Sequence, residues 1–186
     1  MDKQLQRNSA KAVRKSLSER DRKDFNLAIS KKLASLPVIA SAAVIMSYMA
    51  FGVELDLALF HQEMLRAGKK LAFPVTYEQR RMEAYIPQGD DAWMVGTYGI
   101  RTPISQKSLL VDPKDISLIV VPCVAFDQNK MRIGWGGGYY DRYLPRCTNA
   151  YKIGVAYEVQ RIEKIAVDSA WDVTLDVILT ERNFYE

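Results

Sequence analysis

Two long apolar runs constrain the fold of this chain more than any other feature of its sequence. Residues 42–51 read Ala-Ala-Val-Ile-Met-Ser-Tyr-Met-Ala-Phe, and residues 116–121 read Ile-Ser-Leu-Ile-Val-Val. A strand with one exposed face alternates apolar and polar side chains, whereas a strand covered on both faces is apolar almost throughout. Both runs therefore predict buried strands of a parallel sheet, which needs helices on both of its faces.

The segments around these runs predict the helices and the remaining strands. Residues 55–67 have helical periodicity and end at Gly68, and residues 70–75 form the next strand, which completes a β-α-β unit. Further predicted helices cover residues 3–17, 18–36, 139–144 and, as a short stretch, 162–167, and further predicted strands cover residues 152–157 and 173–179. Residues 77–115 contain several Gly and Pro residues and are expected to be irregular, with room for one hairpin.

The order of these elements predicts the fold class. Strands that alternate with helices indicate an α/β protein, here a Rossmann-like, three-layer α/β/α arrangement around a mostly parallel sheet. The chain has 186 residues, of which 48% are hydrophobic, enough for one continuous core. We therefore expect residues 1–186 to form a single domain.

The composition excludes several classes of protein. The net charge of +4 is mildly basic and favours anionic ligands such as phosphates. Cys123 and Cys147 are too sparse for a disulfide scaffold and too far apart for a Cys-x-x-Cys motif. No run reaches the roughly 18 apolar residues of a membrane span, and the charged N-terminus does not resemble a signal peptide. We expect a cytoplasmic protein without membrane contact.

A glycine-rich turn follows the second apolar run and precedes a predicted helix. Residues 132–142 read Arg-Ile-Gly-Trp-Gly-Gly-Gly-Tyr-Tyr-Asp-Arg. Open α/β sheets bind ligands at the carboxyl ends of their strands, and glycines let backbone amides approach phosphate oxygens closely. The turn fits neither the common phosphate loop nor the dinucleotide turn, because Tyr139 stands where a third glycine would fall. A phosphate site is favoured over a turn that is glycine-rich only for steric reasons.

Charged residues elsewhere fit a phosphate ligand. Lys3, Arg7, Lys11 and Arg14 share one helical face, which usually faces solvent but can clamp phosphates beside the glycine turn. The acidic candidates for a magnesium ion or for substrate binding are Glu54, Asp141, Asp172 and Asp176. Magnesium takes one or two carboxylates together with phosphate oxygens, and Asp141 and Asp172 are the favoured pair.

The sequence lacks the usual catalytic nucleophiles. The single histidine, His61, lies within a predicted helix and is expected at the surface or in packing. Cys123 ends a buried strand and is expected to be a small core residue. Catalysis would then depend on positioning and electrostatics.

Several motifs together resemble one family. Phe126-Asp127, Arg132-Ile133-Gly134 and residues 136–142 are similar to the motif of the 5-formyltetrahydrofolate cyclo-ligase family. The resemblance extends to the basic N-terminal helix, about residues 2–17, to residues 54–56 and to Asp172 with Asp176. It implies a three-layer α/β fold and the ATP-dependent conversion of 5-formyltetrahydrofolate to 5,10-methenyltetrahydrofolate. ATP would activate the formyl oxygen, and an amine of the folate itself would close the ring.

The resemblance also implies roles for individual residues. The ATP-binding residues would be Lys3, Arg7, Arg132, Gly134, Gly136, Gly137, Gly138, Tyr139 and Tyr140, so that the N-terminal helix lines the ATP site. The substrate-binding residues would be Met49, Glu54, Trp135, Gly136, Gly137, Gly138 and Tyr139. Arg132, Tyr140 and Asp141 would be catalytic, and Asp141 and Asp172 would hold Mg²⁺. Trp135 departs from the basic or small residue that many relatives carry.

Two other functions compete with this one. A sheet of this kind also handles sugar phosphates or coenzyme A esters, in which case the glycine turn would bind phosphate without ATP. A nucleic-acid-binding module with a basic N-terminal helix is the third possibility, although the net charge is small and no RNA or DNA motif is present. We expect ATP and a reduced formyl folate as ligands, no nucleic acid, and a monomer or weak homodimer.

Overall fold

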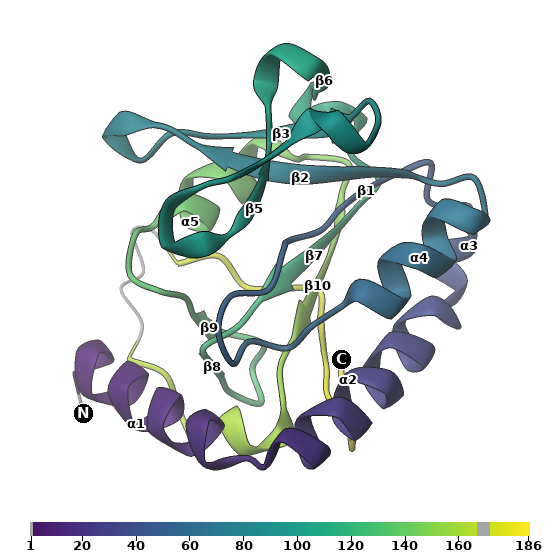
Figure 1. Cartoon of the computed structure of the whole chain (residues 1–186). Helices are drawn as coiled ribbons and strands as arrows, with labels where there is room; N and C mark the ends of the chain where they lie inside the picture. Colours follow the sequence, from purple (N-terminus) through teal and green to yellow (C-terminus); the bar gives the residue numbers. More distant parts are fainter. Residues whose placement is uncertain (1, 167–171) are drawn as a thin grey trace.

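The structure is a computed structural model that describes residues 2–166 and 172–186. Within these residues, eight strands form one sheet in the order β12-β11-β10-β7-β1-β2-β3-β6 (Figure 1). The strands are β1 Val44–Met46, β2 Lys70–Thr76, β3 Met82–Pro87, β6 Ser108–Val111, β7 Leu118–Pro122, β10 Tyr151–Val155, β11 Val177–Leu179 and β12 Phe184–Tyr185. Neighbours from β11 to β2 pair in parallel, and β12, β3 and β6 pair antiparallel at the two edges. The predicted α/β class with a mostly parallel sheet is confirmed.

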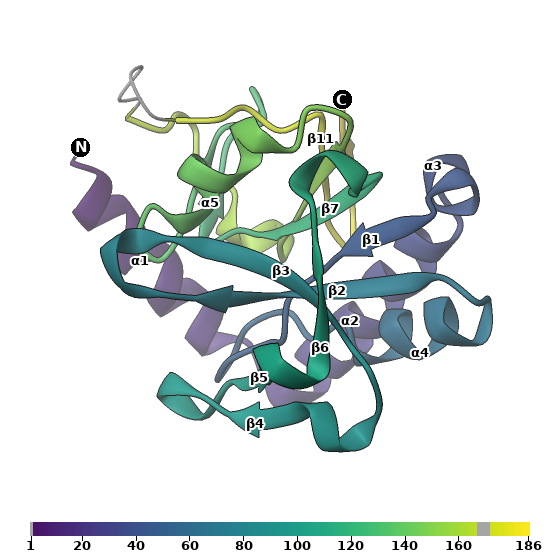
Figure 2. The ribbon, with the colours of Figure 1, turned by 90° about the horizontal axis from the view of Figure 1, so that it is seen from above.

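Helices cover both faces of the parallel strands. The α-helices are α1 Lys3–Ser16, α2 Glu19–Ala34, α3 Pro37–Ser41, α4 Ala58–Arg66 and α5 Tyr139–Tyr143. Successive residues of a strand point to opposite faces, so Ile45 packs in one core with α2 and α4, while Met46 packs in a second core with α5. Figure 2 shows α5 on one side of β7 and β1, and α2 with α4 on the other.

Signals in the sequence explain where the first two helices begin. The side chain of Asp2 accepts a hydrogen bond from the backbone amide of Gln4, and that of Ser18 accepts one from the amide of Asp21. Such caps satisfy amides that have no partner inside the helix. The second helix ends at Ala34, and Pro37 begins the short helix α3 instead of ending the longer one.

The first apolar run forms a shorter strand than predicted. Strand β1 covers three residues, Val44–Met46, instead of residues 42–51. The amide of Ser47 still bonds the carbonyl oxygen of Ala72 at 2.9 Å, but the chain then leaves the sheet. The hydroxyl of Tyr48 donates to the carbonyl oxygen of Leu55 at 2.8 Å and holds the departing loop. Tyr48, Met49 and Phe51 therefore line a cavity instead of extending the sheet.

The middle of the chain is more ordered than predicted. Strand β3 pairs with β2 and β6 with β3, and β4 (Trp93–Val95) pairs with β5 (Arg101–Pro103) in a separate hairpin. The turn from β2 to β3 has positive φ at Gln79 (56°) and Arg80 (59°). Turns of this kind usually contain Gly or Asn, so the sequence allowed for one hairpin in this region but did not locate its turn.

The short helix predicted for residues 162–167 is wrong over residues 162–166, and Val167 lies outside the described residues. A 3₁₀ turn, η7 Glu158–Gln160, precedes this segment. The amide of Ile165 donates to the Asp127 carboxylate at 3.0 Å, and the amide of Ile162 donates to the carbonyl oxygen of Phe126 at 2.8 Å. These amides bond distant parts of the chain, so they do not form a helix.

The structure also bears on the predicted absence of membrane spans and on the two cysteines. Of the described helices, none is both long and apolar enough to cross a membrane. Cys123 and Cys147 are buried thiols, and burial raises the pKa of Cys123 to about 12. Cys123 is therefore a protonated core residue, as the sequence predicted.

Candidate active site

A cavity of about 1250 Å³ lies at the carboxyl ends of strands β1, β2 and β7. Helix α1 and the β4–β5 hairpin lie on opposite sides of this region (Figure 1). Every site residue that the family resemblance implies lines this cavity: Lys3, Arg7, Met49, Glu54, Arg132, Gly134, Trp135, Gly136, Gly137, Gly138, Tyr139, Tyr140, Asp141 and Asp172. The other charged candidates, Lys11, Arg14 and Asp176, are not among its lining residues. The structure thus brings together residues from both ends of the chain.

A small ribbon carries the glycine turn. Strands β8 (Ala125–Phe126) and β9 (Arg132–Ile133) pair antiparallel, and the turn between them is closed by Asp127. The Asp127 carboxylate accepts hydrogen bonds from the amides of Asn129 at 2.9 Å and Met131 at 3.2 Å. Residues 134–138 then run along the cavity from this fixed base to the start of α5.

Glycine is required at two positions of the turn. Gly136 has φ of 103° and Gly138 has φ of 67°, conformations that other residues rarely adopt. A Cβ atom on Gly136 would lie 3.4 Å from the guanidinium carbon of Arg7, and one on Gly138 would lie 2.5 Å from the Arg142 guanidinium. The turn therefore presents its backbone closely to the cavity and to α1.

Helix α1 is fixed against the turn and against the C-terminal part of the chain. The Nε of Arg7 donates to the carbonyl oxygen of Gly134 at 2.8 Å, and Lys3 forms an ion pair with Asp172 at 2.6 Å. Gln6 donates to the carbonyl oxygen of Lys164 at 2.7 Å. The first two cations of the basic row thus line the cavity.

The two acids favoured as metal ligands both pair with cations. Asp141 accepts from Arg132 at 2.7 Å, and the side chain of Arg132 is 3% exposed. Asp172 is held by Lys3, whereas Asp176 accepts from the amide of Lys152 at 2.7 Å, at the start of β10. Among the residues described, no group of three or more His, Cys, Asp or Glu side chains could hold a metal. A cation at Asp141 or Asp172 would therefore need ligand oxygens as well.

Glu54 is a further acidic residue that lines the cavity and contacts the glycine turn. Its carboxylate accepts from the indole N–H of Trp135 at 2.6 Å and from the backbone amide of Phe51 at 3.0 Å. Burial raises the pKa of Glu54, and these hydrogen bonds together with the charge of Arg14 counteract the rise. Glu54 is thus a buried carboxyl group whose orientation is fixed by two donors.

Two polar groups near the turn are buried without a partner. The hydroxyl of Tyr140 and the Nε of Arg132 have no hydrogen-bond partner within the described part of the chain. Burial also raises the pKa of Tyr140 far above its usual value, so its hydroxyl stays protonated and can donate. Buried groups of this kind are costly unless a ligand completes their bonding.

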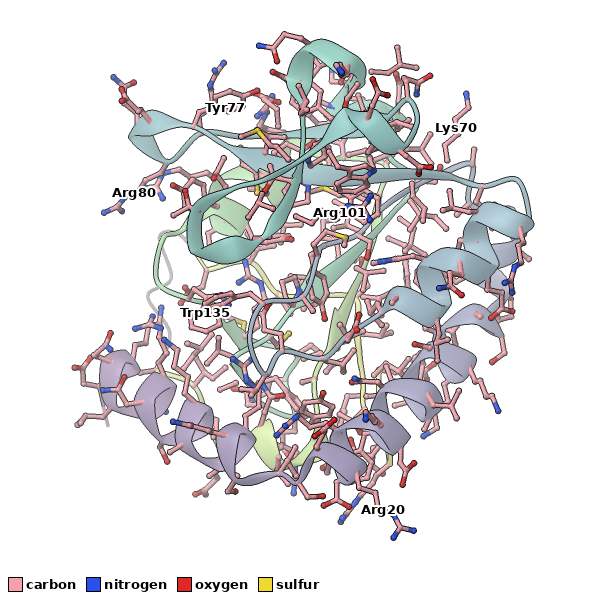
Figure 3. The ribbon with its side chains drawn as sticks, viewed as in Figure 1. Arg20, Lys70, Tyr77, Arg80, Arg101 and Trp135 are labelled. Carbon is pink, nitrogen blue, oxygen red and sulfur yellow. The ribbon has the colours of Figure 1, made fainter. Side chains whose placement is uncertain are left out.

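Residues of the middle region also line the cavity, and the sequence did not assign them to it. Arg80 lies at the β2–β3 turn, and Arg101 lies in β5 with its guanidinium 4.5 Å from the centroid of Trp93 (Figure 3). The adjacent arginines at positions 80 and 81 were the available signal, but they fell in a region expected to be irregular. Tyr48 and Phe73 complete the apolar side of the cavity.

His61 packs in the protein interior, one of the two roles predicted for it. It is 8% exposed, and its Nε2 lies 2.7 Å from the hydroxyl oxygen of Ser47. Burial lowers the pKa of His61 to about 4, so the ring is neutral at pH 7. Its ring also meets Phe73 edge-on at 5.1 Å.

Comparison with protein families gives a match over nearly the whole chain. The model of the 5-formyltetrahydrofolate cyclo-ligase family matches residues 1–181. The 5-formyltetrahydrofolate cyclo-ligase of Escherichia coli K12 is 26% identical over 180 residues, which cover 93% of this chain and 97% of the relative.

Solved structures give a similar result. The structure of 5,10-methenyltetrahydrofolate synthetase from Aquifex aeolicus has a TM-score of 0.88 and 34% identity, and the match covers 100% of this chain and 93% of that one. A 5,10-methenyltetrahydrofolate synthetase from Mycoplasma pneumoniae has a TM-score of 0.80 and 26% identity, with 97% and 99% covered. The similarity therefore includes all the elements around the cavity.

Proposed function

The chain belongs to the 5-formyltetrahydrofolate cyclo-ligase family, and from this membership we propose how its cavity performs the family's reaction. The chain is an ATP-dependent ligase that converts 5-formyltetrahydrofolate to 5,10-methenyltetrahydrofolate. The observation that carries the proposed site is the meeting of α1 with the glycine turn, where Arg7 bonds the carbonyl oxygen of Gly134 at 2.8 Å.

ATP binds between α1 and the glycine turn. Lys3 and Arg7 supply positive charge from the helix, and Arg132 supplies it from strand β9. The backbone amides of residues 134–138 approach the phosphate oxygens, because glycine leaves the turn without side chains at three positions in a row. The hydroxyl of Tyr140 donates a hydrogen bond to a phosphate oxygen.

Asp141 and Asp172 fit a magnesium ion that accompanies ATP. Both line the cavity, and magnesium needs only one or two carboxylates when phosphates and water supply the other oxygens. Each acid would then share its charge between the ion and a neighbouring cation, Arg132 or Lys3. When bound, the ion would neutralise phosphate charge during phosphoryl transfer.

The folate binds beside the nucleotide, on the side of Glu54 and Met49. A carboxylate can accept two hydrogen bonds from the amino-amide edge of the pterin ring. Met49, Trp135 and Tyr139 provide apolar surface for the flat ring system. This arrangement directs the formyl group towards the glycine turn and the phosphates.

The chemistry needs no protein nucleophile. The formyl oxygen attacks the terminal phosphorus of ATP, and ADP leaves. The neighbouring amine of the folate then attacks the activated carbon and forms the ring C–N bond. The C–O bond breaks, and phosphate leaves with the electron pair of that bond and with the proton that the amine loses. The protein aligns the two ligands and stabilises the transferring group.

Arg132, Tyr140 and Asp141 act on the transferring phosphoryl group. Arg132 and Tyr140 have buried donors that lack partners among the residues described. Both donors can form hydrogen bonds to phosphate oxygens. Asp141 orients the guanidinium of Arg132 through their 2.7 Å bond. Groups that are fixed before the reaction stabilise developing charge at little cost in reorganisation.

The test is a direct assay. Purified protein with 5-formyltetrahydrofolate and MgATP should form the near-ultraviolet chromophore of the methenyl product, and the signal should disappear when ATP is omitted. A thermal-shift titration with MgATP should raise the melting temperature, whereas sugar phosphates and coenzyme A should not. Absence of the chromophore at saturating substrates would refute the assigned reaction.

Residues 1–186 act as one cyclo-ligase domain, with α1 as the wall of the ATP site. The protein works in the cytoplasm as a monomer or weak homodimer and needs no nucleic acid. Gel filtration during turnover, compared with the mass of 21.2 kDa, tests the oligomeric state.

A further inference from the structure

Trp135 connects the glycine turn to Glu54. Its indole N–H donates to one carboxylate oxygen of Glu54 at 2.6 Å, while the backbone amide of Phe51 donates to the other oxygen at 3.0 Å. Trp135 is the single non-glycine residue between Gly134 and Gly138. The side chain thus extends from the proposed phosphate loop to the proposed pterin site.

Several contacts fix the indole ring. The ammonium nitrogen of Lys11 lies 4.1 Å from the ring centroid, the guanidinium carbon of Arg14 lies 5.3 Å from it, and the ring of Phe51 meets it edge-on at 5.7 Å. Figure 3 shows Trp135 above helix α1, from which both cations come. Cation–π contacts of this kind are strongest with tryptophan. Lys11 and Arg14 thus hold the side chain of Trp135, whereas Lys3 and Arg7 line the cavity.

The two donors to Glu54 leave room for a ligand. A carboxylate offers about four acceptor positions, two on each oxygen. Trp135 takes one position on the first oxygen and Phe51 takes one on the second. Among the residues that the structure describes, no further donor takes the second position on either oxygen, and a paired amino and amide N–H edge requires one position on each.

We propose that Trp135 is a positioning residue for the folate, whose indole N–H orients the Glu54 carboxylate to accept both hydrogen bonds of the pterin edge. The proposal rests on the assigned reaction and on Glu54 as the pterin-binding carboxylate. It gives Trp135 a role through Glu54, distinct from a stacking surface for the pterin ring. It also gives Lys11 and Arg14 a role, since they hold the indole in the orientation that reaches Glu54.

Several titratable and charged groups that surround Glu54 affect its pKa. Arg14 approaches from α1, Tyr48 from the loop after β1 and Tyr140 from α5, and Lys11 lies above the indole ring. Burial raises the pKa of Glu54, and the indole hydrogen bond is the largest of the effects that lower it. Loss of the indole donor therefore raises the pKa of Glu54 further. As the pH falls, the Glu54 carboxylate then becomes protonated at a higher pH than in the unmodified protein.

The experiment replaces the indole without removing an aromatic ring. In Trp135→Phe, we expect the KM for 5-formyltetrahydrofolate to rise about tenfold, because a hydrogen bond to a charged group is removed. The kcat and the KM for ATP should stay within about twofold, and the acid limb of kcat/KM should move to higher pH. In a Glu54→Gln background, Trp135→Phe should have little further effect, since the two residues act together.

A matched control removes a similar bond elsewhere. The hydroxyl of Tyr185 donates to Glu158, so Tyr185→Phe also deprives a glutamate of an aromatic donor, but outside the cavity. Tyr185→Phe should leave the folate KM and the acid limb unchanged. Because Trp135 is 45% exposed, Trp135→Phe should fold, which an unchanged thermal shift with MgATP checks.

Three outcomes separate the possibilities. An unchanged folate KM and acid limb in Trp135→Phe would overturn the positioning role. A normal Trp135→Phe together with a defective Trp135→Leu would assign Trp135 to stacking and would also overturn it. If the wild-type protein formed no methenyl product, the assigned reaction itself would fail, and the proposal would fall with it.

Discussion

The guanidinium of Arg7 donates from its Nε to the carbonyl oxygen of Gly134 at 2.8 Å, which joins helix α1 to the glycine turn. The two residues are 127 positions apart in the chain. A guanidinium has five N–H donors, and this bond uses one of them. Arg7 can therefore fix the turn and still present donors to a phosphate.

Arg7→Ala should weaken ATP binding far more than folate binding. Loss of charged hydrogen bonds to phosphate should raise the KM for ATP about 10- to 100-fold, while the folate KM changes less than about threefold. Steady-state kinetics with each substrate varied in turn measures both values. Lys15→Ala is the matched control, because Lys15 is an exposed cation on the same helix and should leave both KM values unchanged.

Tyr140→Phe should separate stability from nucleotide binding. Its hydroxyl is buried and has no hydrogen-bond partner among the described residues, so its removal should raise the free energy of unfolding of the ligand-free protein by about 1 kcal/mol. The same change should lower kcat/KM for ATP about tenfold. Denaturant unfolding measures the free energy of unfolding, and steady-state kinetics measures kcat/KM for ATP.

Tyr143→Phe is the control for that experiment. Tyr143 lies on the same helix but is packed in the second core, 1% exposed. The Tyr143→Phe variant should keep the normal kcat/KM for ATP. Equal losses in both variants would contradict a specific role for Tyr140.

Asp141→Asn should lower kcat about 100-fold, because it disturbs both the proposed metal site and the orientation of Arg132. It should also destabilise the protein by about 1–2 kcal/mol, since the buried guanidinium loses its charged partner while Asp141 itself is 26% exposed. Kinetics over a series of magnesium concentrations should show that high magnesium does not restore kcat.

Glu83→Gln supplies the comparison for this ion pair. Glu83 pairs with Arg146 at 3.0 Å, but Arg146 is 44% exposed. The variant should lose less than about 1 kcal/mol and keep its kcat. A loss of kcat in Glu83→Gln as large as in Asp141→Asn would indicate a general effect of surface charge.

His61 should make the protein less stable as the pH falls. Its pKa is about 4 in the folded state, below the ordinary value of 6.5, so between these values the unfolded chain binds more protons. The stabilisation is complete above the unfolded pKa and should decline by about 2 kcal/mol from about pH 7.5 to about pH 5. Urea unfolding over this range should show a smaller decline in His61→Gln; equal slopes would contradict the buried neutral ring.

The sequence predicted the central sheet well, because its strands are buried on both faces. The run at residues 116–121 corresponds to β7, Leu118–Pro122, the strand between β10 and β1. Continuous apolarity identifies such a strand but does not determine its ends. In the first apolar run, residues 42–51, Tyr48, Met49 and Phe51 lie beyond the end of strand β1 and line the cavity.

The parts that the sequence missed depend on contacts between distant residues. The amide of Ile165 bonds Asp127, which no local pattern predicts, and the segment was expected to be helical. The turn at Gln79 and Arg80 has positive φ without the usual residues. The glycine turn and the basic row were visible because they depend on residue type and helical spacing. The contact of Trp135 with Glu54 was not, since 81 positions separate them.

The pairing of α1 with the C-terminal segment has a consequence for synthesis on the ribosome. Lys3 bonds Asp172, and Gln6 bonds the carbonyl oxygen of Lys164, so the docking of helix α1 requires residues that are synthesised more than 150 positions later. These contacts of α1 therefore cannot all form until Asp172 has been synthesised. A chain that stalls before residue 164 emerges from the exit tunnel would leave the docking face of α1, which consists of Gln6, Ala10 and Arg14, exposed to solvent.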